Sequence, residues 1–174
     1  SQSFHQKVNP PAPYSVIKGA LDRDGPVLRR EYKGEEISIS VMRLANIMPA
    51  GAEDDEDSDS ISQLFLHVDV SKPGRSEGLH FLCGLYPDAV GIHSVCLRPK
   101  GPGSDPASLS KNRGRVFQEL DQKMRDGFHM YIEARGVNEK LFPFLQAWLY
   151  VKDHRNLMHW FKRVGTFINE RKTT

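Results

Sequence analysis

The sequence predicts an α+β fold in which an antiparallel β-sheet is flanked by C-terminal helices. Three observations lead to this prediction. Apolar and polar residues alternate over several segments of the first part of the chain, which is typical of half-buried strands. In the last third, apolar residues recur at spacings of three and four, which is typical of amphipathic helices. Strand-like and helix-like segments do not alternate along the chain, so a parallel α/β sheet is not expected.

Length and composition fit one compact domain. The chain has 174 residues, of which 39% are hydrophobic and 26% are charged. We expect an extended lead-in over residues 1–13 and a single domain over 14–174, with the sheet at about 14–99 and the helices at about 114–170. No run of about 18 apolar residues occurs, so no transmembrane segment is expected.

The first two expected strands form a hairpin. Residues 27–32 read as one strand, Lys33-Gly34 reads as a turn, and residues 36–42 alternate almost without fault. Ile37, Ile39 and Val41 fall on the same face. This pattern predicts an antiparallel pair whose second strand points these three side chains into the core.

Three more strands are expected after an acidic segment. Residues 64–70 alternate, Pro73-Gly74 marks a turn, and the next inward set runs from Leu79 to Leu85. Pro87-Asp88 turns the chain again, and residues 92–97 read as the last clear strand. Residues 101–112 are rich in Gly, Pro and Ser, and we interpret them as the loop before the helices.

Three helices are expected in the last third. The first carries an apolar stripe from Phe117 to Tyr131 and ends at Gly136. The second includes Leu141 in its apolar stripe, and Pro143 must lie in its first turn or bend it. The third begins with Asp153 as N-cap. Its wide apolar face must pack on the sheet, on another helix or on a neighbouring subunit. That face consists of Leu157, Trp160, Phe161, Val164, Phe167 and Ile168.

Charge is distributed unevenly along the chain. The formal net charge is +2, but one short run within a loop at 50–60 is densely acidic. Such a run usually forms a solvated loop, and the sharper alternative is a docking site for basic partners. The candidate partner-binding residues are Glu53, Asp54, Asp55, Glu56, Asp57 and Asp59.

Basic residues gather before and within the expected helices. They read either as a solvated helix surface or as a site for RNA, whose phosphates would make binding fall steeply with salt. The candidate RNA-binding residues are Lys111, Arg113, Arg115, Lys162 and Arg163.

The two cysteines, Cys83 and Cys96, are too few for a disulfide framework or a zinc ligand set. They can be placed opposite each other across the turn at Pro87. Two reduced thiols are the expected state, and a regulatory disulfide is the alternative. Few cysteines and the lack of a secretory signal suggest a reducing compartment.

The histidines His67 and His80 fall on neighbouring expected strands. Pairing Ser71 with Ser76 places the two imidazoles opposite each other on the outer face of the sheet. Two such rings could bind a metal ion, but no third ligand from Cys, Asp or Glu falls beside them. We therefore expect polar side chains on the outer face of a one-sided sheet, and no metal site.

No local motif for catalysis is present. The chain lacks a phosphate-binding glycine loop, a Gly-x-Ser-x-Gly elbow and a His-Glu-x-x-His pair. We accordingly expect no catalytic residue and no cofactor, and we predict that the protein is not an enzyme.

Two segments of the chain resemble the mitochondrial glycoprotein family in the form seen in plants and fungi. The C-terminal part carries the more specific residues, in the order Phe117-Gln118-Glu119-Leu120-Asp121, Tyr131-Ile132-Glu133-Ala134-Arg135-Gly136-Val137-Asn138, Phe144-Leu145, Lys152-Asp153, His159-Trp160-Phe161-Lys162 and Phe167-Ile168. Residues 28–37 resemble the first hairpin of the family, and the acidic loop follows in the expected place. The resemblance covers roughly residues 27–168.

This resemblance implies a strongly twisted antiparallel sheet with terminal helices, three copies of which form a ring-shaped homotrimer. It implies a mitochondrial matrix protein whose transit peptide has been removed. It also implies a chaperone-like factor without catalytic activity that binds mitochondrial proteins, and in some members RNA or ribosomal particles. Such factors support mitochondrial ribosome assembly, translation and oxidative phosphorylation.

Two features of this chain depart from the family pattern. The family is usually strongly acidic, whereas this chain is slightly basic outside one run, which leaves more room for RNA or an acidic partner. The family's N-terminal helix is not visible in residues 1–13, so the trimer is expected to depend on the C-terminal helices. The candidate subunit-interface residues are Phe144, Trp148, Trp160 and Phe161.

Overall fold

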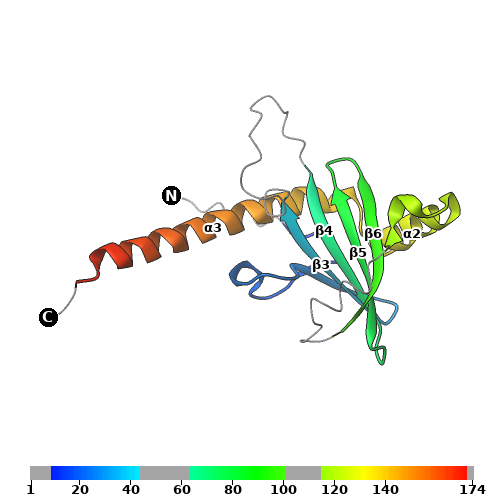
Figure 1. Ribbon diagram of the computed structural model, residues 1–174, viewed down its shortest axis with the longest axis horizontal. Helices are drawn as coiled ribbons and strands as arrows, with labels where there is room; N and C mark the ends of the chain where they lie inside the picture. Colours follow the sequence, from blue (N-terminus) through cyan, green and yellow to red (C-terminus); the bar gives the residue numbers. More distant parts are fainter. Residues whose placement is uncertain (1–8, 44–62, 101–114, 172–174) are drawn as a thin grey trace.

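Seven strands form one antiparallel sheet in which every strand pairs with its neighbour along the chain (Figure 1). The computed structural model describes residues 9–43, 63–100 and 115–171. The strands are β1 (Ser15–Val16), β2 (Leu28–Tyr32), β3 (Glu35–Arg43), β4 (Leu64–Ser71), β5 (Glu77–Leu85), β6 (Val90–Pro99) and β7 (Arg115–Val116). The expected antiparallel α+β architecture is therefore confirmed.

The hairpin of β2 and β3 forms as the sequence predicts. Tyr32 pairs with Glu35, and the two turn residues Lys33 and Gly34 have φ angles of 47° and 80°. Positive φ at both positions is the mark of a type I′ turn, whose twist suits a two-residue hairpin. Ile37 and Ile39 are fully buried, so the alternation of β3 does point one face into the core. The two-residue strands β1 and β7 were not predicted, because they are too short to show a period.

Helices cover the inner face of the sheet. They are α2 (Gln122–Ala134) and α3 (Phe142–Asn169), accompanied by the 3₁₀ turns η1 (Ala20–Asp22), η3 (Phe117–Glu119) and η4 (Glu139–Leu141). The ring of Phe81 in β5 lies 5.9 Å from that of Phe128 and 5.8 Å from that of Tyr131 in α2. Leu141 and Leu145 are fully buried at the start of α3. The outer face of the sheet has no helix of the described residues over it (Figure 1).

The first long helix begins later than predicted. Phe117 lies in the turn η3, and α2 starts after Asp121, whose side-chain Oδ1 accepts a hydrogen bond from the backbone N of Met124 at 2.8 Å. This N-cap fixes the start of the helix because it satisfies one of the amides that have no partner within the first turn.

The predicted second and third helices are one continuous helix, so the expectation that Asp153 is an N-cap was wrong. Residues 142–169 contain no internal proline, and Pro143 lies in the first turn as expected. The Asp153 carboxylate instead forms an ion pair with Arg43 of β3. The local pattern misled because an aspartate that pairs across the fold looks the same in sequence as one that caps a helix.

The C-terminal end of α2 is closed by Gly136, as predicted. Gly136 has φ 80°, its N donates to Glu133 O at 2.9 Å, and Val137 N donates to Ile132 O at 3.0 Å. This pair of reversed hydrogen bonds is the Schellman motif, which places a glycine in the left-handed region. A Cβ added to Gly136 would lie 3.1 Å from Cε2 of Tyr14 and 3.2 Å from Nη1 of Arg30.

We therefore expect Gly136→Ala to lower the free energy of unfolding by about 1–3 kcal/mol, because it combines a left-handed L-residue with a crowded neighbour. Urea denaturation followed by circular dichroism measures the change. Gly127→Ala is the matched control, since Gly127 lies inside α2 with open space around its Cα, and it is expected to stabilise by up to about 1 kcal/mol. A Gly136→Ala variant as stable as the parent protein would contradict this account of the helix end.

Candidate functional site

The C-terminal half of α3 projects from the body of the molecule (Figure 1). The first half is anchored, because Phe142, Leu145 and Leu149 are buried against the rest of the chain. The second half, residues 156–169, is here called the α3 arm. Its large apolar side chains are well exposed, with exposed fractions of 55% for Trp160 and 53% for Phe161.

Three ion pairs hold the middle of α3 where the arm begins. Lys152 Nζ lies 3.7 Å from Asp24 Oδ1, Arg155 Nη2 lies 2.5 Å from Asp22 Oδ1, and Asp153 pairs with Arg43. Among the described residues, no ion pair joins α3 to the rest of the chain beyond Arg155. Within the described residues, the arm is thus a single helix that leaves its base with no further ion pair to the rest of the chain.

The apolar residues of the arm follow the spacing of a helix-packing seam. Residues 157, 161, 164 and 168 are separated alternately by four and three positions, as in a coiled coil. Trp160 and Phe167 flank this seam on one side and Met158 on the other. The face is therefore wider than the two-position stripe of a simple two-helix coil.

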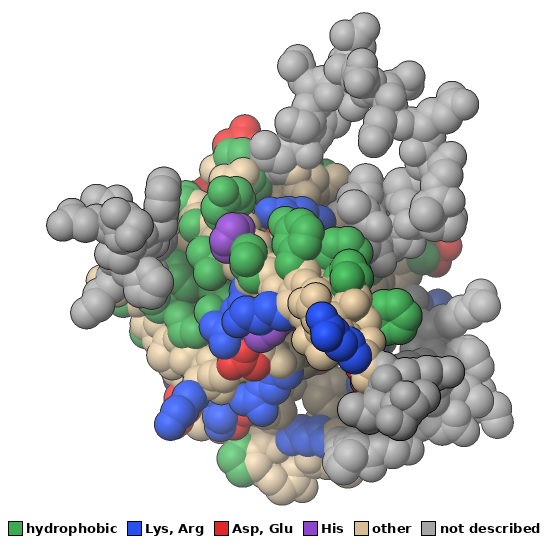
Figure 2. Space-filling model, turned by 90° about the vertical axis from the view of Figure 1, so that its left-hand side faces the viewer, with side chains coloured by type: hydrophobic (Ala, Val, Ile, Leu, Met, Phe, Trp, Pro, Cys, Tyr) green, Lys and Arg blue, Asp and Glu red, His purple; other side chains and the backbone are tan. Residues whose placement is uncertain are grey.

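Basic residues share the arm with this apolar face. Lys162 and Arg163 are exposed on the arm, and the exposed Glu170 and Arg171 follow its end. Figure 2 looks at the molecule from the end where α3 terminates, and it shows hydrophobic and basic side chains facing the viewer together. The arm therefore presents an apolar seam with a positive flank.

A buried ion pair joins the β2–β3 hairpin to the end of α2. Arg135 donates from Nε and Nη2 to the two carboxylate oxygens of Glu35, both at 2.9 Å. Each side chain is only 10% exposed. The hydrogen bonds from Arg135 hold the pKa of the Glu35 carboxyl below its usual value. The guanidinium also stacks on the ring of Tyr131, 3.3 Å from its centroid.

The same end of α2 is held from two further directions. The hydroxyl of Tyr14 donates to the backbone oxygen of Arg135 at 2.7 Å, and Arg30 Nη1 donates to that same oxygen at 3.1 Å. Burial raises the pKa of the Tyr14 hydroxyl. The residues on which the family resemblance rests, in 28–37 and 131–138, thus meet in one structural cluster, so their role here is to fix α2 on the sheet.

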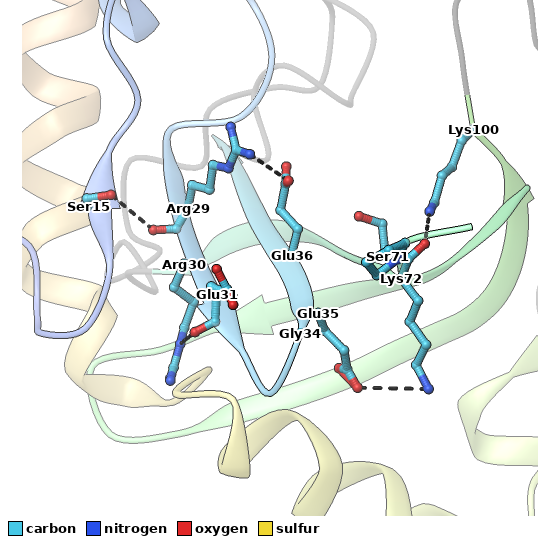
Figure 3. A pocket seen from close by; sticks show the side chains of 11 residues that line it. Ser15, Arg29, Arg30, Glu31, Gly34, Glu35, Glu36, Ser71, Lys72 and Lys100 are labelled. Carbon is cyan, nitrogen blue, oxygen red and sulfur yellow. Dashed lines mark hydrogen bonds and ion pairs between the residues drawn. The ribbon is translucent and has the colours of Figure 1, made fainter. Parts of the chain in front are cut away.

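An open groove of about 650 Å³ lies beside this hairpin (Figure 3). Most of its charged side chains interact with other side chains or backbone oxygens of the same protein. Arg29 Nη2 lies 2.5 Å from Glu36 Oε2, and Lys72 Nζ lies 4.0 Å from Glu35 Oε1. Lys100 Nζ donates to the backbone oxygen of Lys72 at 2.7 Å. The groove therefore offers a ligand charged groups of both signs, most of which already pair with other groups of the protein.

Two histidines and one aspartate meet on the outer face of the sheet. The prediction that His67 lies opposite His80 was wrong, because Asp69 pairs with His80 and His67 pairs with Leu82. The prediction that no acidic residue lies beside them was also wrong, since His80 Nδ1 lies 2.5 Å from Asp69 Oδ1. His80 is only 4% exposed, so it is not a solvated surface residue. Within the described residues, no group of three or more His, Cys, Asp or Glu is arranged to hold a metal ion.

The two cysteines are free and lie on opposite faces of the sheet. Their predicted cross-strand pairing was wrong, because Cys83 lies opposite Ile92 and Cys96 lies opposite His80, and a register shift at Leu82/Cys83 separates the two pairs. Burial raises the pKa of the Cys83 thiol to about 12. Reduced thiols, the expected state, agree with this geometry.

The other candidate residues are dispersed. The acidic residues from Glu53 to Asp59, and also Lys111 and Arg113, lie outside the described residues. Arg115 is in β7 at one edge of the sheet, whereas Lys162 and Arg163 are on the α3 arm, which leaves the other side of the body (Figure 1). Phe144 and Trp148 pack into the chain's own core. Only Trp160 and Phe161 of the four interface candidates are left available to another subunit.

Comparisons with known sequences agree with the resemblance. Residues 2–168 match the profile of the mitochondrial glycoprotein family, MAM33. An uncharacterized mitochondrial protein of Arabidopsis thaliana is 29% identical over 151 residues, which are 82% of this chain and 57% of that protein. The mitochondrial acidic protein mam33 of Schizosaccharomyces pombe is 33% identical over 108 residues, which are 58% of this chain and 40% of that protein. The chain thus spans about half the length of these relatives, whose names support a mitochondrial location.

Solved structures show the same fold. A hypothetical protein from Leishmania major, described as a sequence homologue of the human p32 protein, superposes with a TM-score of 0.66 at 16% identity. That match covers 96% of this chain and 89% of the other. The Trypanosoma brucei p22 protein superposes with a TM-score of 0.59 at 23% identity, covering 82% of this chain and 75% of the other. In the part of this chain that the structure describes, no helix is both long and apolar enough to cross a membrane.

Proposed function

Because the chain belongs to the mitochondrial glycoprotein family, we propose that it is a non-enzymatic, chaperone-like binding protein of the mitochondrial matrix that works as a ring-shaped homotrimer. In this proposal, residues 14–174 form the single domain of the protein. Binding of mitochondrial proteins would support ribosome assembly, translation and oxidative phosphorylation. The main support for the proposal is that the large apolar side chains of the α3 arm are exposed in the single chain.

An isolated helix with this apolar face is not stable in water by itself. Most of the stability of a protein helix comes from packing of its apolar face against other parts of the protein. Phe167 and Ile168 are 78% and 72% exposed in the single chain, and Trp160 and Phe161 are about half exposed. Large contiguous apolar patches on soluble proteins mark interaction sites. We propose that copies of this chain cover the arms of one another.

The number three comes from the family resemblance, and the width of the arm's face agrees with it. A coiled coil of two helices needs only a narrow seam, whereas this seam has large side chains on both flanks. The buried first half of α3 and the ion pairs at the base of the arm set its direction, so each copy would present it in the same way to its neighbour.

Affinity purification from mitochondria tests the binding role. The tagged chain is purified with and without nuclease, beside a chain carrying Trp160→Glu and Phe161→Glu. We expect mitochondrial proteins to be retained after nuclease treatment by the unchanged chain. If no mitochondrial protein is enriched over a tag-only control, the binding role is wrong.

RNA binding is the second candidate function. It is favoured by the exposed Lys162 and Arg163 on the free arm and by the exposed Arg115 on β7. Filter binding of a single-stranded RNA at increasing salt measures it, and we expect affinity to fall with a log–log slope of about −0.7 for each phosphate contact. Lys162→Gln with Arg163→Gln should reduce that slope. Affinity that is independent of salt, or absent near physiological salt, would reject this candidate.

A further inference from the structure

The side chains of Asp69, His80 and His67 form one continuous hydrogen-bonded chain on the outer face of the sheet. His80 Nδ1 lies 2.5 Å from Asp69 Oδ1, and His80 Nε2 lies 2.8 Å from His67 Nδ1. The two imidazole centroids are 4.9 Å apart, so the rings meet nearly edge to edge, with the two nitrogens between them. Both nitrogens of His80 are therefore occupied, and the ring is buried.

This geometry fixes where protons can reside. The contact between His80 and Asp69 takes a proton on His80 Nδ1, because a carboxylate only accepts. The contact between the two rings holds one proton, which belongs either to His67 or to His80. If it belongs to His80 and His67 carries its own proton on Nε2, the His80 ring is a cation that is stabilised by Asp69. In either arrangement, both hydrogen bonds of the Asp69–His80–His67 series are kept.

A second charge cannot enter without breaking this arrangement. If both rings are imidazolium ions, each nitrogen in the 2.8 Å contact carries a hydrogen, and neither can accept. Two positive charges at this separation also repel strongly in a half-buried site. The ring of His67, which is the less buried of the two, must then turn away from His80.

The surroundings oppose that second charge. Arg98 of β6 adds a positive charge near His67, and Cys96 of β6 lies opposite His80. From β3, Ser38 and Ser40 lie opposite Asp69 and His67, and neither titrates. Burial, then His80 and Arg98, lower the pKa of His67, while Asp69 raises it.

We propose that Asp69, His80 and His67 form a proton-operated latch on the outer face of the sheet, closed while the two rings carry at most one positive charge and open when both are charged. Opening uncovers His80 and turns this face cationic beside Arg98. The core on the inner face is not part of the change, so acidification alters the surface that the protein presents without unfolding it. The inference concerns a different face from the α3 arm and does not depend on the proposed trimer.

Nitrogen-15 NMR of the imidazole rings in the unchanged protein tests the latch directly, from about pH 8 to pH 5. We expect the ring signals of His67 and His80 to change together, with the final proton entering below the usual histidine pKa of about 6.5. In the same transition, the exchange rate of the hydrogens on the His80 ring nitrogens should rise about tenfold. This factor corresponds to the loss of one charge-assisted hydrogen bond.

Two variants separate the latch from ordinary titration. Asp69→Asn keeps the accepting oxygen but removes the charge, so it should shift the first protonation of the pair to lower pH. His67→Asn leaves His80 beside Asp69 without a second ring, so the coupled change of the two ring signals should disappear. His154→Asn, on the exposed surface of α3, is the control and should leave both rings unchanged. Independent titration of the two rings in the parent protein, or no shift in Asp69→Asn, would overturn the proposal.

Discussion

Replacing Trp160 and Phe161 together by glutamate is expected to convert the proposed trimer into a folded monomer. Both side chains lie on the projecting arm and are about half exposed in the single chain, so they contribute little to the stability of one copy. Burial of such side chains between subunits would contribute about 1.5–3 kcal/mol each. Loss of about 4 kcal/mol at each interface weakens association roughly a thousandfold, and size-exclusion chromatography with light scattering measures the resulting mass.

The matched control lies on the opposite side of the same helix. His159 and Thr166 are exposed and fall outside the seam and its flanks, so His159→Glu with Thr166→Glu adds the same charge without touching the apolar face. This control should remain oligomeric. Circular dichroism should show both double variants folded. If the control dissociates as readily as the seam variant, added charge and not lost apolar contact would explain the result.

Breaking the buried pair of Glu35 and Arg135 should produce the largest loss of stability in the single chain. Glu35→Gln leaves the guanidinium of Arg135 buried without its counterion, which typically costs about 3–5 kcal/mol. Replacing both residues by methionine removes both charges, so it should cost much less than the sum of the single changes. Urea denaturation of Glu35→Met, Arg135→Met and the double methionine variant gives this coupling directly.

A surface pair on the same hairpin provides the control. Arg29 and Glu36 are also in contact, but their side chains are 56% and 49% exposed, so Glu36→Gln should change stability by less than about 1 kcal/mol. A loss in Glu35→Gln no larger than that in Glu36→Gln would show that the buried pair does not hold α2 on the sheet.

The pair also makes stability depend on pH in a defined direction. The pKa of Glu35 is lower in the folded protein than its ordinary value of 4.5. The unfolded state therefore binds more protons in this range, so stability falls as pH falls. The contribution of Glu35 should be fully present above about pH 4.5 and disappear as pH falls through the lower pKa of the folded state. Denaturation curves at several pH values should show that Glu35→Gln loses this dependence.

Strand positions were predictable from sequence because each strand of the central sheet has one buried face. The alternation through Ile37 and Ile39, and through Leu66 and Val68, reports that face directly. Partners across strands were less predictable. The β4–β5 register differs from the predicted one by two residues, since Val70 pairs with Leu79. A shift of two keeps every side chain on its face, so the predicted faces held while the predicted partner of His80 did not.

The candidate sites depended on information that no local pattern contains. Glu35 and Arg135 lie in two segments that are far apart in the sequence. Only the fold brings their side chains within 2.9 Å of each other. The bulge at Leu82/Cys83 separated the two cysteines because one extra residue in β6 reverses the faces beyond it. The exposed arm was foreseen only as an apolar face in need of a partner, because Asp153 reads as an N-cap in sequence, whereas it lies inside one continuous helix and pairs with Arg43.

Sedimentation equilibrium of the unchanged chain at micromolar concentration tests the central claim most directly. The proposal that the α3 arms cover one another in a homotrimer predicts a mass three times the chain mass of 19.7 kDa, which stays constant upon tenfold dilution. A single species at 19.7 kDa under these conditions would contradict it, because the apolar arm would then be stable in water without any partner.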